Sequence, residues 1–186
     1  MNAMPNRAAP RAAPFGTTLC EAELCIHTRA LQEAIRLTRL GARAVLVTQL
    51  TGLEKAVANR LYRQLHGRPS PPGQLPFSDV WYLKQDQRMA QATLVWQLSQ
   101  RFAKSRSTPA RRLIDVYECY LWLATEPLLD IMRVAFVPHL VTVQEWEERT
   151  CGQCGLAYVA PRGSVATPVG VADCISATAA GIAARR

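Results

Sequence analysis

Residues 42–67 contain two segments of helical periodicity separated by a short break, and this arrangement limits the folds open to the chain. The break contains Thr51 and Gly52, which favour a tight turn between helices. In the second segment, apolar residues recur at four-residue steps, which is typical of the buried face of a helix. They are Leu53, Val57, Leu61 and Leu65.

Another face of the second segment carries polar and cationic residues. They are Lys55, Asn59, Tyr62, Arg63 and His66. Arg, Lys and Asn are the side chains that contact base edges or hold phosphates. The pattern therefore predicts a helix-turn-helix unit whose second helix is a recognition helix. The alternative is a pair of amphipathic helices whose basic face is only solvated.

The charge of the chain is unevenly placed. The net charge is +8, and residues 29–68 contain eight Lys or Arg and two Glu. Residues 101–112 contain five Lys or Arg and no acid, whereas residues 113–150 contain two Arg and seven acids. This asymmetry predicts a polyanionic partner on one surface and a protein partner on another. The alternative is that the excess charge serves solubility alone.

The 186 residues suit one helical domain with a small appendix. Residues 1–17, rich in Ala, Pro and Arg, are expected to form a disordered tail. A mainly α-helical bundle is expected over residues 18–150, and it contains the helix-turn-helix unit. Its further helices are predicted from about Leu19 toward Leu40, from Ser78 or Asp79 to about Lys104, from Thr108-Pro109, and from Glu126-Pro127 to just before Pro138. Residues 151–186 are expected to form a small cysteine-rich, zinc-ribbon-like module and a flexible tail.

The sequence predicts neither a signal peptide nor a membrane span. Pro5, Pro10 and Pro14 interrupt any apolar run at the N-terminus, and no later apolar stretch approaches the length of a span. We therefore expect a cytoplasmic protein with reduced cysteines. No Walker loop, dinucleotide-binding turn or nucleophile elbow is present, so no enzymatic activity is predicted.

The cysteines near the C-terminus predict a metal site. Cys151 and Cys154 have the C-x2-C spacing of a zinc knuckle, and Cys174 follows a hairpin predicted within residues 156–172. A second knuckle would need a cysteine at position 177, where the chain has Ala177. The fourth ligand of a structural zinc ion is left open. The candidates are Asp173, His139, Cys119 and a water molecule, or the site is degenerate.

Two other kinds of cysteine site were weighed against this one. A redox C-x2-C pair lacks the strand–helix setting of thioredoxin. A catalytic zinc site of the nucleotide-deaminase type would need a His-x-Glu motif, which none of the three histidines provides.

Several blocks of the sequence resemble the FlhC subunit of the bacterial flagellar master regulator. They are LTRLGAR at residues 37–43, RLYRQLHG at 60–67, PSPPGQLPFS at 69–78 followed by Trp81, YECYL at 117–121, and EPLLDIMR at 126–133. Cys151 and Cys154 match the first zinc pair of the family. The resemblance covers roughly residues 28–155. Residues 175–184 depart from the basic C-terminus of the family because they are rich in Ala, Thr and Gly, which indicates a diverged member.

The resemblance implies a transcription activator that pairs with FlhD in a hetero-oligomer, binds promoter DNA upstream of flagellar operons and recruits RNA polymerase. It also implies a structural zinc ion held by four cysteines. Cys151, Cys154 and Cys174 fall on three of these positions, and Ala177 falls on the fourth.

Helical periodicity, independently of the resemblance, selects the residues that are expected to contact DNA. They are Lys55, Asn59, Arg60 and Arg63, with Arg36, Arg39 and Arg43 as phosphate contacts. The alternative is a regulatory subunit with weak or no DNA binding of its own. It would bind a FlhD-like partner through the Trp81–Trp96 segment or the acidic residues 113–150.

Overall fold

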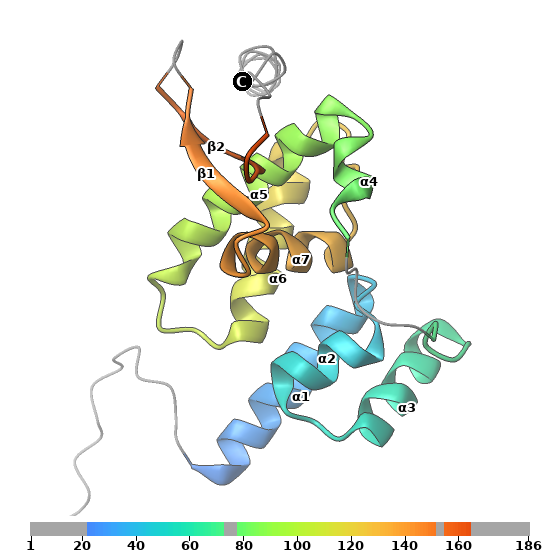
Figure 1. Cartoon of the computed structure of the whole chain (residues 1–186). Coiled ribbons are helices and arrows are strands. Elements are labelled where there is room, and N and C mark those ends of the chain that lie inside the picture. The colour runs from blue at the N-terminus through green and yellow to red at the C-terminus, as the bar shows by residue number, and fades with distance from the viewer. Residues whose placement is uncertain (1–21, 73–77, 152–154, 165–186) are drawn as a thin grey trace, which may run out of the picture.

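The computed structural model describes residues 22–72, 78–151 and 155–164. Within these residues the chain is mainly helical, as predicted, and carries one small antiparallel sheet (Figure 1). The helices are α1 (Glu23–Arg39), α2 (Ala44–Thr51), α3 (Lys55–His66), α4 (Val80–Leu83), α5 (Asp86–Ala103), α6 (Pro109–Leu123) and α7 (Ile131–Thr142). The strands are β1 (Trp146–Thr150) and β2 (Ala157–Pro161). The tail predicted at residues 1–17 lies outside the described residues.

The first three helices pack against one another and include the predicted helix-turn-helix pair. α1 ends in a Schellman motif, in which Gly41 takes a φ of +93° and the Ala42 amide donates to the Leu37 carbonyl oxygen over 2.9 Å. α2 ends at Gly52, whose φ of +71° favours glycine at this position. Gly52, Leu53 and Glu54 therefore form the three-residue turn that leads into α3, which confirms the predicted arrangement.

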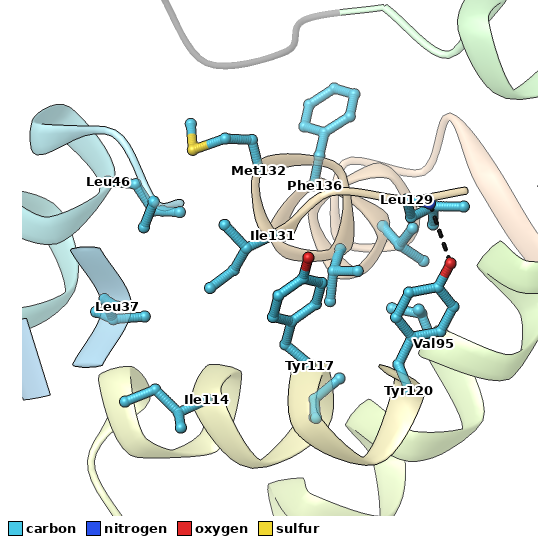
Figure 2. Close-up of a cluster of buried hydrophobic side chains, with 14 of the residues drawn as sticks. Leu37, Leu46, Val95, Ile114, Tyr117, Tyr120, Leu129, Ile131, Met132 and Phe136 are labelled. Carbon is cyan, nitrogen blue, oxygen red and sulfur yellow. Dashed lines mark hydrogen bonds between the residues drawn. The ribbon is translucent and has the colours of Figure 1, made fainter. Parts of the chain in front are cut away.

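The hydrophobic core runs without a break from the α1–α3 unit into the rest of the helices. Leu37 and Leu46 of that unit belong to the same cluster as Ile114 of α6 and Ile131 and Met132 of α7 (Figure 2). α5 packs against α6, α7 and β2. The α1–α3 unit is thus fixed to a helical support.

β1 and β2 form a hairpin that lies on α5. Strand pairing runs from Trp146 opposite Pro161 to Thr150 opposite Ala157. The Gln97 side chain donates to the Ala157 carbonyl oxygen over 2.7 Å, and buried Trp146 donates its indole N–H to Asp79 Oδ2 over 3.0 Å. These bonds hold the hairpin on the helical support.

Two of the predicted helices differ from the observed ones. The helix expected from residue 78 or 79 to 104 is interrupted between Leu83 and Asp86. The helix expected to begin at Glu126-Pro127 begins at Ile131 instead, where Asp130 Oδ1 accepts from the Arg133 amide over 2.8 Å. It also continues through Pro138, because the burial of Val134, Val137 and Leu140 outweighs the roughly 3 kcal/mol cost of an internal proline.

The predicted position of the hairpin was also wrong. It was expected within residues 156–172, whereas the observed partner of β2 is β1, which precedes Cys151. The acidic residues 147 and 148, expected in a polar segment, belong to this strand. The cysteine pair therefore lies in the stretch of sequence that joins β1 to β2, and residues 165–172 of the predicted hairpin lie outside the described residues.

Candidate nucleic-acid interface and cysteine turn

α3 presents a cationic outer face. The helix packs against α1 and α2 and lies at the edge of the molecule, away from the β-hairpin (Figure 1). Ala58 points into the protein and is fully buried, whereas Lys55, Arg60 and Arg63 are exposed. Asn59 is half-buried between these two faces. Three of the four DNA-binding candidates on α3 are thus open to a partner.

The inner face of α3 differs from the predicted one. Tyr62 was expected on the polar face but is only 4% exposed, whereas Leu65 was expected on the buried face and is 36% exposed. The rings of Tyr62 and His66 are in contact, with centroids 4.4 Å apart and planes tilted by 36°. His66 Nε2 lies 2.8 Å from the Thr38 carbonyl oxygen near the end of α1. His66 therefore links α3 to α1, and Tyr62 is buried beside it and does not form an outward contact.

No carboxylate in the described ranges forms an ion pair with a cation of α3. The pairs found there are Arg36–Glu118, Arg111–Asp115 and Arg149–Glu147. Arg60 and Arg63 are three residues apart, so they lie on the same side of the helix. Within the described residues, the cations on the outer face of α3 are therefore not neutralised by an ion pair.

The predicted phosphate contacts on and after α1 have three different environments. Arg36 Nη2 lies 2.5 Å from Glu118 Oε1 of α6, so its charge is already paired. Arg39 is exposed in the last turn of α1. Arg43 is half-buried at the N-cap of α2, and its backbone amide lies 3.4 Å from Met132 Sδ.

The structure also reveals exposed cations that the sequence analysis did not assign to a site. Arg101 lies in the last turn of α5, Lys104 and Arg106 lie between α5 and α6, and all three are exposed. The signal for them in the sequence is the run of five Lys or Arg without an acid at residues 101–112.

Of the three predicted cysteine ligands, the described residues include Cys151 alone; Cys154, Cys174, Asp173 and Ala177 lie outside them. Cys151 is 2% exposed at the end of β1. Its amide donates to the Leu156 carbonyl oxygen and its carbonyl accepts from the Gly155 amide, each over 2.9 Å. Gly155 has a φ of +70°. This tight turn, closed by the backbone around a buried thiol, fits one half of a zinc knuckle.

The described residues do not supply the rest of a zinc site. Within them, no three His, Cys, Asp or Glu side chains come together in an arrangement that could hold a metal ion. Cys119 is half-buried on α6, where burial raises the pKa of its thiol and Asp115 and Glu118 raise it further. His139 is exposed on α7.

Comparison with known proteins places the chain among the flagellar transcription regulators. A curated regulator of Sodalis glossinidius is 28% identical over 138 residues, which cover 72% of this chain and 70% of the relative. One of Variovorax paradoxus is 30% identical over 140 residues, covering 72% and 68%, and one of Pectobacterium carotovorum is 25% identical over 148 residues, covering 77% of each. The family model of the flagellar transcriptional activator FlhC matches residues 21–185. The chain belongs to the FlhC family.

The family assignment confirms the predicted resemblance and the predicted role in transcription regulation and flagellum formation. The family is a class of regulators and not of enzymes. Among the helices of the described ranges, none is both long and apolar enough to cross a membrane.

Proposed function

We propose that this protein is the DNA-binding activator subunit of a flagellar master regulator. It acts in the cytoplasm with a FlhD-like protein at flagellar promoters and recruits RNA polymerase. The observation that carries the DNA-binding part is the outer face of α3, where Lys55, Arg60 and Arg63 are exposed and no described carboxylate pairs with them. The FlhD-like partner and the polymerase follow from the FlhC family.

The dimensions of α3 suit the major groove of DNA. Its 12 residues span about 18 Å. An α-helix enters the major groove, where Arg donates two hydrogen bonds to guanine and Asn pairs with adenine. Arg60, Arg63 and Asn59 are the residues proposed for base or phosphate contacts, and Lys55 for a phosphate contact at the start of the helix.

Arg36, Arg39 and Arg43 are proposed as phosphate contacts beside α3. The exposed Arg39 can reach a phosphate without breaking an ion pair with a described residue. Arg36 must exchange its pair with Glu118 for a phosphate. We therefore expect Arg36→Gln to weaken DNA binding less than Arg39→Gln does.

The salt dependence of binding tests the role of α3. Each phosphate contact adds about 0.9 to the magnitude of the slope of log K against log salt. The double variant Arg60→Gln/Arg63→Gln should weaken binding to a flagellar promoter fragment and lower that magnitude by up to about 1.8. A control is Lys84→Gln, an exposed cation between α4 and α5. Equal slopes for the α3 variant and the wild type would mean that the basic face is only solvated.

A second candidate function is a regulatory subunit that binds the partner and contributes little DNA binding of its own. Trp122 at the end of α6 favours this role, because it is 69% exposed next to Leu121, which is 38% exposed. Exposed aromatic residues often anchor protein interfaces. Gel-shift experiments with and without a FlhD-like protein separate the two functions. The second is supported if the partner alone binds the promoter as tightly as the complex does.

We also propose a structural zinc ion held by Cys151, Cys154 and Cys174. Thiolates bind zinc strongly, and the ion would supply folding energy to the C-terminal module and no catalysis. Metal analysis of the purified chain tests this directly. We expect about one zinc ion per chain and a clear loss of zinc in Cys154→Ser. Cys25→Ser, which changes an exposed cysteine on α1, is the control and should retain the zinc.

A further inference from the structure

The segment from Arg101 to Arg112, here called the basic connector, joins α5 to α6 and has no role in the proposed function. It contains five cations and no acid. Arg111 pairs with Asp115, and Arg112 Nη1 donates to the Ser107 carbonyl oxygen over 3.3 Å. Arg101, Lys104 and Arg106 are exposed, and none of them forms an ion pair with a described residue. Three cations of the connector are therefore available to a partner.

The backbone of the basic connector is held by its own short-range hydrogen bonds. Ser105 donates its amide and its hydroxyl to the Phe102 carbonyl oxygen, over 3.0 and 2.8 Å. The hydroxyl groups of Ser105 and Ser107 are 2.6 Å apart. Thr108 Oγ1 accepts from the Arg111 amide and donates to Glu33 Oε1 of α1 over 2.6 Å. A loop fixed in this way loses little conformational freedom when it binds a partner.

The basic connector and α3 are both attached to α1. Thr108 contacts α1 at Glu33, and His66 contacts it at Thr38, which is five residues or about 8 Å further along the helix axis. Arg29 and Arg36 of α1 line a hollow of about 260 Å³ together with Ser107 of the connector. The connector thus adjoins Arg29 and Arg36 of α1, and Arg39 follows in the last turn of the same helix.

The surface chemistry of the basic connector suits a phosphate backbone better than a protein. Its exposed side chains are charged or polar, apart from Ala103 and Pro109, which line a hollow between the helices. A protein interface usually has an apolar centre, whereas Arg101, Lys104 and Arg106 are all charged. Phosphate contacts need only cations and hydrogen-bond donors, and the connector offers both.

We infer that the basic connector is a second contact with the DNA backbone, in addition to α3. This inference rests on the proposed DNA binding and extends its surface. One turn of B-DNA is about 34 Å long, and α1, to which both segments are attached, spans about 25 Å. The points at which the two segments contact α1 are thus closer together than one turn of the duplex is long. α3 would contact bases, and the connector would set the position of the protein without discriminating sequence.

A matched pair of double variants tests the connector in the full-length protein with its FlhD-like partner. The connector variant is Lys104→Gln/Arg106→Gln. The control variant is Lys84→Gln/Arg162→Gln, which removes one exposed Lys and one exposed Arg elsewhere. Binding is measured against salt on a flagellar promoter fragment and on an unrelated duplex of equal length. The connector variant should lower the magnitude of the salt slope by up to about 1.8 on both duplexes, and the control should leave it unchanged. A connector variant that matches the control overturns the inference.

The α3 variant Arg60→Gln/Arg63→Gln separates this inference from the proposed function. In one outcome, the α3 variant loses its preference for the promoter, and the connector variant has the same salt slope as the control. This outcome supports the proposed function and rejects the second contact. In another outcome, the connector variant has a salt slope of lower magnitude, and the α3 variant binds DNA as the control does. This outcome supports the second contact and rejects α3 as the recognition helix. A complex without salt-dependent DNA binding rejects both.

Discussion

At the scale of single residues, the Tyr120 hydroxyl provides a hydrogen-bond acceptor for the backbone amides of Leu128 and Leu129. These residues lie between α6 and α7, and their amides have no backbone acceptor among the described residues. Tyr120 is fully buried, donates to Gln91 Oε1, and accepts from the Leu128 and Leu129 amides over 2.9 and 3.0 Å (Figure 2). Burial raises the pKa of Tyr120, so the hydroxyl stays neutral and able to donate. A buried amide without an acceptor costs about 1–3 kcal/mol.

We therefore expect Tyr120→Phe to lower the free energy of unfolding by about 1–3 kcal/mol, because the Leu129 amide loses its acceptor. Urea denaturation measures this change. Tyr117→Phe is the matched control, since Tyr117 lies on the same helix and its hydroxyl has no hydrogen bond to a described residue. If the two variants are equally stable, the Tyr120 hydroxyl does not support the segment.

The sequence could not place His66 or Arg36, because each of them depends on a distant partner, nor Tyr62, whose ring contacts that of His66. His66 contacts a carbonyl 28 residues away, and Arg36 pairs with a carboxylate 82 residues away. Tyr and His carry an apolar ring and a polar tip, so helical periodicity alone fits either face. In contrast, Lys55, Arg60 and Arg63 are exposed as predicted, because a charged side chain without a partner stays in water.

At the scale of secondary-structure elements, the cap of α6 joins this helix to α1. Thr108 Oγ1 caps the helix by accepting from the Arg111 amide over 3.1 Å, and it also donates to Glu33. We expect Thr108→Ala to lower the free energy of unfolding by about 1–2 kcal/mol through the lost cap. Thr108→Ser, which keeps the hydroxyl, should stay close to the wild type in thermal unfolding. A similar loss in both variants would assign the effect to the methyl group.

Helix starts were predictable only where the signal is local. Thr108-Pro109 was predicted correctly, because the cap and the proline act within the first turn. Glu126-Pro127 carries a similar signal, yet the amides of the next two residues bind Tyr120, so the helix starts only at Ile131. The turn between α2 and α3 was predictable because Gly52 tolerates a positive φ. The strand pairing was not predictable, because the sequence does not show that residues 146–150 pair with residues 157–161.

At the scale of the whole molecule, the α1–α3 unit and its helical support share one core. Leu37 and Leu46 belong to the same buried cluster as Ile131 and Met132 (Figure 2). Because the two parts bury their apolar surface against each other, neither keeps its core when the other unfolds. The orientation of α3 toward DNA is then set by the packing of α1 and α2 on α6 and α7.

We therefore expect one cooperative unfolding transition. All four tryptophans lie outside the α1–α3 unit, so their fluorescence reports on the support, whereas far-UV ellipticity reports on every helix. The two denaturation curves should coincide. Ile131→Ala should shift both together, with a loss of about 2–5 kcal/mol, because Ile131 is fully buried in the shared core. Val143→Ala, at a half-exposed position after α7, should change stability by less than about 0.5 kcal/mol. Separate midpoints for the two signals would mean that the α1–α3 unit folds independently of the helices that are proposed to orient it on DNA.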